Sequence, residues 1–275
     1  MNLTEQVRAA LHEDIQTGDI SASLIPQDTW GYAEIIAREA AVVCGQAWVN
    51  EVFRQIDERI ILSWHVAEAS VQDSPNTWAS IEGPLRGILT AERTALNFLQ
   101  TLSAIASKTK TYVDLIANYP CHILDTRKTI PGLRLASKYA VRCGGGMNHR
   151  MGLYDAFLIK ENHIAALGSI TQAVVAARAL DVSKPLIVEV QDLDDYMEAQ
   201  ALHVSRIMLD NFDDPMIEAV LALQDNYPAV IEVSGGIDEQ RLLKLAQMGV
   251  DFISIGGLSK SIAAIDLSLL VRENN

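Results

Sequence analysis

The sequence is short of long apolar runs and of positive charge. No apolar run approaches the roughly 18–20 residues that a membrane-spanning helix needs, which argues against a membrane protein. The 275 residues carry 22 Lys and Arg against 35 Asp and Glu, a formal net charge of −13. This balance argues against a nucleic-acid-binding face and against attachment to an anionic membrane surface.

Cysteine is also scarce. The three cysteines, Cys44, Cys121 and Cys143, are far apart in the sequence and show no CxxC spacing. An odd number without paired spacing is not typical of a disulfide framework or of a zinc site. The first 15 residues predict an amphipathic acidic helix rather than a secretion signal. We therefore expect reduced core thiols in a cytoplasmic protein.

The few cations are concentrated in one stretch. Residues 127–160 hold seven of the 22 Lys and Arg and a single acid, Asp155, with three consecutive glycines at 144–146. An acidic chain gains no solubility from clustered cations, so the stretch indicates a small, heavily anionic ligand. The seven cations are Arg127, Lys128, Arg134, Lys138, Arg142, Arg150 and Lys160.

The first half of the chain mixes helical and strand patterns. Residues 2–14 predict a helix capped by Asn2 with Glu5 three residues on. Residues 91–117 predict a long helix whose buried stripe includes Leu96, Leu99 and Leu102. Between them, β-like patches are separated by turn residues; they span 30–37, 41–44, 60–66 and 78–89.

From residue 121 a different rhythm begins, in which short apolar runs end in polar residues. The later runs recur about every 21 to 23 residues, with helical patterns between them that begin at the caps Asp192, Asp213 and Asp238. Repeated strand–helix units predict parallel strands of an α/β barrel. Six runs suggest that the barrel is incomplete; they are 122–124, 156–159, 186–188, 207–209, 230–233 and 252–255.

In such barrels the active site lies at the carboxyl ends of the strands, and phosphate sites often follow the last two. The turns 234–236 and 256–257 are rich in glycine, whose backbone N–H groups can face an anion. Arg127 and Arg150 can hold carboxylate or phosphate through planar forks. Arg134 is better explained by surface ion pairing, and Lys138 and Arg142 by the solvated face of a helix over 133–142.

Lysines and carboxylates at the same ends allow several chemistries. Lys128 and Lys160 add point charges, and Lys160 is alternatively a Schiff-base lysine. Glu189 and Asp210 end neighbouring strands, so they can hold Mg²⁺, bind ribose hydroxyls or stabilise a developing cation. A structural ion pair with Lys128 or Lys160 is the other reading. No HExxH, GxSxG or Walker lysine motif is present. The residues alone therefore indicate a magnesium-assisted reaction on a phosphorylated, multiply carboxylated small molecule.

Taken together, these residues resemble the quinolinate phosphoribosyltransferase family, the decarboxylating nicotinate-nucleotide pyrophosphorylases. No single motif is specific, but the combination is, and it runs almost from end to end. The matching segments are 13–14 with 18–19, Glu-Arg-Thr-Ala-Leu-Asn at 92–97, Asp-Thr-Arg-Lys-Thr at 125–129, 131–132, Gly-Gly-Gly at 144–146 with Asn-His-Arg at 148–150, 158–160 with 162–163, 189, 209–211 and Ser-Gly-Gly at 234–236.

The resemblance implies an α/β fold: an N-terminal α/β sandwich domain (1–105) and a C-terminal incomplete, open α/β barrel of about seven strands (106–261). The tail 262–275 is expected to pack back on the first domain. It also implies a cytoplasmic homodimer with shared active sites, or a larger assembly of such dimers. The substrates would be quinolinate and 5-phosphoribosyl 1-pyrophosphate (PRPP), with Mg²⁺ and no organic cofactor.

The resemblance also assigns residues. Arg127, His149, Arg150 and Lys160 would hold quinolinate, with Arg93 reaching in from the partner subunit. Lys128, Glu189 and Asp210 would be catalytic, with the two carboxylates on Mg²⁺, directly or through water. The phosphate of PRPP would bind Ser234, Gly235, Gly236, Gly256 and Gly257.

One departure is visible. After Gly256 the family commonly has Ala-Leu-Thr, whereas this chain has Gly257, Leu258 and Ser259, followed by Lys260. Three other functions remain open at this point: a related molybdenum-transport-associated protein, a Schiff-base aldolase using Lys160, and a non-catalytic anion-binding module. The carboxylates Glu189 and Asp210 argue against the last.

Overall fold

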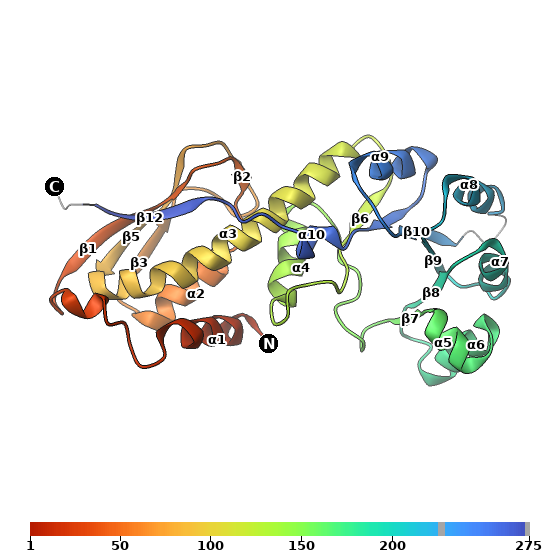
Figure 1. Ribbon diagram of the computed structural model, residues 1–275, viewed down its shortest axis with the longest axis horizontal. Coiled ribbons are helices and arrows are strands. Elements are labelled where there is room, and N and C mark those ends of the chain that lie inside the picture. Colours follow the sequence, from red (N-terminus) through yellow and green to blue (C-terminus); the bar gives the residue numbers. More distant parts are fainter. Residues whose placement is uncertain (225–228, 273–275) are drawn as a thin grey trace. The chain divides into compact units, whose positions relative to one another are not determined.

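The computed structural model describes residues 1–224 and 229–272 and contains a four-stranded antiparallel sheet in the order β12-β1-β5-β3. Burial alternates along β1, because successive side chains of a strand point to opposite faces. Figure 1 shows the late strand β12 lying beside β1. The prediction for the first strand is confirmed. The strands are β1 (Trp30–Ala37), β3 (Ile61–Trp64), β5 (Asn76–Pro84) and β12 (Leu267–Arg272).

The predicted strand at 78–89 is wrong in its last five residues. β5 ends at Pro84, and the long helix α3 (Leu85–Leu115) begins at the next residue, six residues before the predicted start. Ile88 and Ala91 already lie on its buried face, so the apolar run passes from strand to helix without a polar interruption. The predicted stripe is confirmed: Leu96, Leu99, Leu102, Ile105 and Ala106 are all buried.

Helix α2 (Gln46–Ile56) was not expected within the β-like region. Its buried residues Trp48, Val49, Val52 and Phe53 have helical spacing, which the surrounding strand patches obscured. Helix α1 (Leu3–Ile15) begins with the predicted capping box of Asn2 and Glu5. The other elements described near these are η1 (Ala22–Leu24), β2 (Ala41–Val42), β4 (Val71–Gln72), α4 (Arg134–Cys143) and α10 (Gly257–Lys260).

A second sheet has six parallel strands in the order β6-β11-β10-β9-β8-β7. All six runs that the sequence predicts are strands. The first strand of the set pairs with the last, as in a sheet that curls into a barrel. The strands are β6 (His122–Leu124), β7 (Phe157–Ile159), β8 (Leu186–Val190), β9 (Arg206–Asp210), β10 (Val230–Ser234) and β11 (Phe252–Ser254).

The seventh position of the barrel is reduced to one residue. Met147 makes an isolated parallel bridge to Leu124, on the free edge of β6. Among the described residues no ladder joins Met147 to β7, so the barrel is open there. Six full strands plus this bridge account for the expected incomplete barrel of about seven strands.

Helices α5 to α9 lie between the strands from β7 to β11, and Figure 1 shows α7, α8 and α9 outside β8, β9 and β10. The predicted caps are confirmed: Asp192, Asp213 and Asp238 each accept a bond from a backbone N–H in the first turn. The helices are α5 (Glu161–Leu167), α6 (Ile170–Leu180), α7 (Leu193–Ala201), α8 (Asp214–Ala222) and α9 (Glu239–Met248).

By internal contacts the chain forms two compact units. One comprises residues 1–110, 129–145 and the chain from Gly257 onward; the other comprises 111–128 and 146–256. The division expected at 105/106 stays a prediction, and 273–275 of the expected tail lie outside the described residues. Within the described chain no single helix is long and apolar enough to cross a membrane. Only by length and composition could α5 and α6 together do so, as a pair bent by 92°.

Candidate active site

Strand register brings three polar side chains together at the carboxyl ends of the barrel strands. Asp210 pairs with Ser234 across β9 and β10, and Glu189 pairs with Met208 across β8 and β9. Because residues two apart on a strand share a face, Glu189, Asp210 and Ser234 all face the same side. Ser234 Oγ donates a hydrogen bond of 2.7 Å to Asp210 Oδ1, and Asn211 Nδ2 donates one of 2.9 Å to Oδ2.

Lys160 lies directly after β7 and forms an ion pair through its Nζ with Oε2 of Glu189. The Glu189 side chain is only 6% exposed, so this pair is shielded from water on one side. The structure therefore has the Lys160–carboxylate pair weighed from the sequence. His163 is exposed, and its Nδ1 accepts a 3.1 Å bond from the Lys160 backbone N–H, which fixes the turn before α5.

The turn after β10 is built for glycine. Gly235 and Gly236 have φ of 98° and 53°, in the left-handed region where side chains are disfavoured. A Cβ at Gly235 would lie 2.1 Å from Asn211 Oδ1, so no larger residue fits without moving Asn211. The turn thus keeps its backbone uncovered next to Ser234, as a phosphate-binding turn requires.

Gly256 follows β11 and lies against Lys128, which follows the neighbouring strand β6. A Cβ at Gly256 would be 2.8 Å from Lys128 Cδ, so the glycine makes room for the lysine stem. The exposed Lys128 side chain is thereby placed beside one of the two predicted phosphate turns. Gly257 begins α10, with its carbonyl accepting a 2.9 Å bond from Lys108 Nζ.

Two arginines lie close enough to repel each other. The pKa of Arg150 is lowered, first by burial and then by the positive charge of Arg127, while Asp155 and Glu189 oppose the shift. Arg150 Nη1 donates to the Ala156 carbonyl at 3.2 Å. Two guanidinium groups held this way gain stability when an anion binds between or beside them.

His149 is fixed from both sides. It is 9% exposed, and its backbone N–H donates a 2.9 Å bond to the buried carboxylate of Asp125. Its Nδ1 accepts the backbone N–H of Arg150 at 2.7 Å, so Nε2 is the nitrogen left to carry a proton. Nε2 lies 3.6 Å from Glu232 Oε1.

The Glu232 carboxylate was missed from the sequence. Glu232 is fully buried on β10, with Arg206 Nη2 at 2.7 Å and a bond from the Ser254 hydroxyl. Burial raises the pKa of Glu232, and the positive charge of Arg206 opposes that rise. The Arg206 guanidinium also stacks over Phe252, 4.6 Å from the ring centre. The sequence signal that could have revealed this pair is a charged residue within each of two otherwise apolar strands, Arg206 in β9 and Glu232 in β10.

Some predicted residues are placed elsewhere. Arg93 lies on α3 in the other compact unit, with its side chain 59% exposed and 4.0 Å from Glu92. The prediction that Lys138 lies on a solvated face is wrong, since it is 1% exposed within α4. Arg142 is exposed as predicted, with its guanidinium 5.8 Å from the Tyr139 ring centre. Arg134 Nε donates to Thr129 Oγ1 at 3.3 Å.

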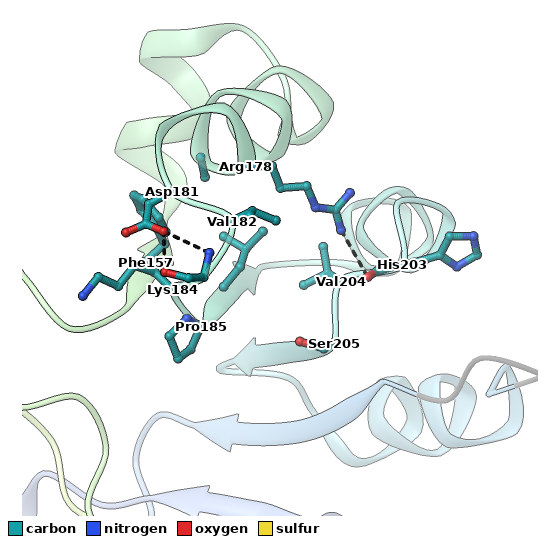
Figure 2. Close-up of a pocket in the computed structure, with 12 residues that line it drawn as sticks. Phe157, Arg178, Asp181, Val182, Lys184, Pro185, His203, Val204 and Ser205 are labelled. Atoms are coloured by element: carbon teal, nitrogen blue, oxygen red, sulfur yellow. Dashed lines mark hydrogen bonds between the residues drawn. The ribbon is translucent and has the colours of Figure 1, made fainter.

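A hollow of about 300 Å³ lies at the opposite ends of the strands (Figure 2). Its lining includes Pro185 and Ser205, which precede β8 and β9, and Arg178, which donates to the Leu202 and His203 carbonyls. The hollow is therefore separate from the carboxyl-end residues. The convergent polar groups, not this hollow, mark the candidate active site.

The fold and the site define a class: an open α/β-barrel enzyme with cations, paired carboxylates and glycine turns for an anionic, phosphorylated substrate. Two family models match the chain, the quinolinate phosphoribosyl transferase N-terminal domain over residues 15–103 and its C-terminal domain over 105–270. The chain belongs to the quinolinate phosphoribosyltransferase family, whose members are phosphoribosyltransferases.

Individual relatives agree over nearly the whole length. A probable nicotinate-nucleotide pyrophosphorylase of Synechocystis is 40% identical over 96% of this chain and 90% of its own. The corresponding protein of Mycobacterium leprae is 38% identical, over 96% and 95%. The solved nicotinate-nucleotide pyrophosphorylase of Francisella tularensis superposes with a TM-score of 0.94 at 48% identity, covering 98% of this chain and 96% of its own.

The buried ion pair of Arg206 and Glu232 yields a prediction about stability. Arg206→Met leaves the fully buried Glu232 without its cation and should lower the free energy of unfolding by about 3–5 kcal/mol at neutral pH. Glu232→Gln should cost less, because burial already favours the uncharged form of this carboxyl group. Urea unfolding of both variants at pH 7 measures the difference.

The pH dependence follows from the direction of the shift. In Arg206→Met the folded-state pKa of Glu232 lies further above its unfolded value, so the folded state binds the extra proton between those two values. The deficit of this variant relative to wild type should therefore shrink as the pH falls from 8 to 5. An unchanged deficit, or a larger cost for Glu232→Gln, would contradict the role given to burial.

Proposed function

We propose that the chain transfers phosphoribosyl from PRPP to quinolinate, releasing pyrophosphate and CO₂ and giving nicotinate mononucleotide, a step of NAD biosynthesis. The observation that carries the proposal is the meeting of two charge sets at the carboxyl ends of one barrel. Arg127, Arg150 and Lys160 offer positive charge for a dianion. Glu189 and Asp210 offer negative charge for a cation that forms during the reaction.

Quinolinate would bind on the cationic side. Its two neighbouring carboxylates suit the forks of Arg127 and Arg150, whose mutual repulsion a dianion relieves. Lys160 adds an ammonium group, and His149, the residue before Arg150, would line the same side. Because Lys160 and Arg150 are both held by protein partners, the pyridine ring would be oriented before it reacts.

PRPP would bind across the glycine turns. Its 5-phosphate suits the backbone of Ser234, Gly235 and Gly236, because the two glycines place no side chain over it. Lys128, beside Gly256, would neutralise phosphate charge, and Gly257 would complete this side. Compared with the family's Ala-Leu-Thr, Gly257 and Ser259 each lack one methyl group.

Glu189 and Asp210 also fit a magnesium ion delivered with PRPP. They face the same side of neighbouring strands, and carboxylate oxygens are ligands that Mg²⁺ prefers, usually with waters and substrate oxygens. When bound, Mg²⁺ would neutralise the departing pyrophosphate. The carboxylates themselves are hydrogen-bonded or paired, which holds them in place for either the ion or the ribose hydroxyls.

The bonds then change in two steps. The bond from the anomeric carbon to pyrophosphate breaks, and the pyridine nitrogen forms a new bond to that carbon. Positive charge on the ribose during this exchange is stabilised by Glu189 and Asp210. The bond to the 2-carboxylate then breaks, its electron pair moves to the cationic ring, CO₂ leaves and the ring carbon takes a proton. No organic cofactor is required for either step.

The Lys160–Glu189 ion pair weighs against an aldolase. A Schiff-base lysine needs a free amine lone pair to attack a carbonyl, whereas the Lys160 Nζ is engaged with the Glu189 carboxylate. The structure therefore supports Lys160 as a substrate-binding cation rather than a nucleophile.

The proposal is tested by product analysis. Purified protein with quinolinate, PRPP and Mg²⁺ should give nicotinate mononucleotide by mass spectrometry, and none when the metal is chelated. Nicotinate offered in parallel should give no product, because it lacks the 2-carboxylate that Arg127 and Arg150 would bind. A folded protein that gives no product from quinolinate would overturn the proposal and favour a binding role.

Replacing Arg150 should separate the two substrates. Arg150→Ala removes a charged partner worth about 1.5–3 kcal/mol from one carboxylate, so KM for quinolinate should rise roughly 10- to 150-fold. KM for PRPP should change far less. Steady-state kinetics measures both, with Arg178→Ala at the other end of the barrel as the matched control. Equal increases for the two substrates would contradict the assignment.

We also propose a homodimer in which Arg93 of one subunit completes the site of the other. Arg93 belongs to the compact unit that holds none of the barrel strands, and its side chain is exposed rather than buried. An exposed cation on a long helix is available to a partner's anionic ligand. In a dimer with twofold symmetry, the Arg93 of each subunit would reach the site of the other.

Mixing two inactive variants tests this arrangement. Arg93→Ala and Lys160→Ala homodimers should each be inactive, but hybrids contain one site with both cations intact. Random exchange should restore roughly a quarter of wild-type activity, since half the dimers are hybrids and half their sites are complete. If native mass spectrometry shows that hybrid dimers have formed and the mixture is still inactive, Arg93 does not act on the partner's site.

A further inference from the structure

A cluster of metal-ligand side chains lies in the compact unit that lacks the barrel, and the proposed reaction does not use it. The Sγ atoms of Cys44 and Cys143 and a carboxylate oxygen of Glu68 all lie within 4.8 Å of one another. Cys44 directly precedes Gly45 and α2, Glu68 lies between β3 and β4, and Cys143 ends α4. The fold thus joins two cysteines that are 99 positions apart in the sequence.

The carboxylate of Glu68 is already oriented. Its Oε1 accepts the backbone N–H of Gly45 and the hydroxyl of Tyr139, both at 2.9 Å, and its Oε2 accepts the backbone N–H of Gln46 at 3.2 Å. Such outer bonds hold ligand oxygens in place in metal sites. The positive end of the α2 dipole also offsets negative charge gathered there.

The sulfur atoms have a fixed support and a route to solvent. Cys44 is fully buried, and its backbone N–H and carbonyl both bond to Ser103 Oγ, at 3.0 and 3.2 Å. Cys143 is half-buried, so the cluster opens toward the surface on its side. A rigid buried ligand and a second one near solvent are what a metal needs to enter and stay.

The surroundings shift the pKa values of the two thiols in opposite directions. Cys143, burial and Glu68 all raise the pKa of the Cys44 thiol. The pKa of Cys143 is lowered by its contact with Cys44 and by Tyr139 and Arg142. The two sulfurs therefore interact directly, and a metal bound by both would have to displace the proton of the Cys44 thiol.

We propose that Cys44, Cys143 and Glu68 form a site for one thiophilic divalent cation of the zinc type, with water as the fourth ligand. Binding exchanges the two thiol protons for the metal, forms two metal–sulfur bonds and one metal–oxygen bond, and involves no oxidation. Three ligands with thiolate and carboxylate donors suit Zn²⁺ in tetrahedral geometry. A disulfide would need only the two sulfurs and would leave the oriented Glu68 carboxylate without a role.

The site would clamp three segments of its unit: the start of α2, the loop of Glu68 and the end of α4. Its predicted contribution is to stability rather than to catalysis. Binding to the folded chain alone raises the unfolding temperature with metal concentration. This consequence is independent of the proposed transferase activity.

Cobalt(II) is the first probe, because its bonds to thiolate absorb in the near ultraviolet and its tetrahedral complexes absorb in the visible range. The reduced full-length protein should bind one Co²⁺ per chain with both signals, and Zn²⁺ should displace it. Cys143→Ser should lose most of the sulfur band. Cys121→Ser, which removes a buried cysteine of the other unit, should keep it.

A second pair of measurements separates ligation from folding. Glu68→Gln should keep the sulfur band but weaken Co²⁺ binding by at least about 10-fold, since loss of a direct ligand should cost no less than loss of an outer partner. Zinc should raise the unfolding temperature of the wild type but not of Cys143→Ser. Cobalt bound without a sulfur band is adventitious and overturns the site. The site is also overturned if the reduced protein takes up no metal. This holds even if the same protein forms a Cys44–Cys143 disulfide when it is exposed to air.

Discussion

The two-residue repeat of a parallel strand is the constraint on which the site depends. Because every second side chain points to the same face and the strands run in the same direction, a charge near the end of one strand meets its neighbour's charge at the same edge. Glu189, Asp210 and Ser234 are brought together in this way. The same repeat places Arg206 and Glu232 deeper in the same face, where each offsets the other's loss of water.

The charged residues of the barrel fall into two groups, those buried within the sheet and those at its edge. The deeper charges are satisfied by one another and hold His149 from behind, whereas the cations at the edge are held by backbone carbonyls or carboxylates and remain partly exposed. Binding an anion there would require little rearrangement of the protein, because the groups that would contact it are already supported. The glycine turns contribute in the opposite way, by withholding side chains from the space that a phosphate would occupy.

The sequence predicts those parts of the fold that are determined by residues close together in the chain. All six parallel strands, the three aspartate caps and the first strand were predicted, since each depends on neighbouring residues alone. Helix α2 and the first turn of α3 were not, because their apolar residues adjoin strand residues without a break. The burial of Lys138, the Glu232–Arg206 pair and the meeting of Cys44 with Cys143 depend on which distant segments pack together. No local pattern specifies that.

The position of β12 has a consequence for how the chain folds during synthesis. This strand forms one edge of the first sheet and pairs along most of β1, yet it is made after every strand of the barrel. The first sheet thus leaves the ribosome with β1 as an unpaired edge, which is a template for wrong pairing with other chains. The six strands of the barrel sheet lie within residues 122–254, so all of them are synthesised while the β1 edge is still unpaired. The first unit is therefore the last to have its full sequence synthesised, although most of its residues come first in the chain.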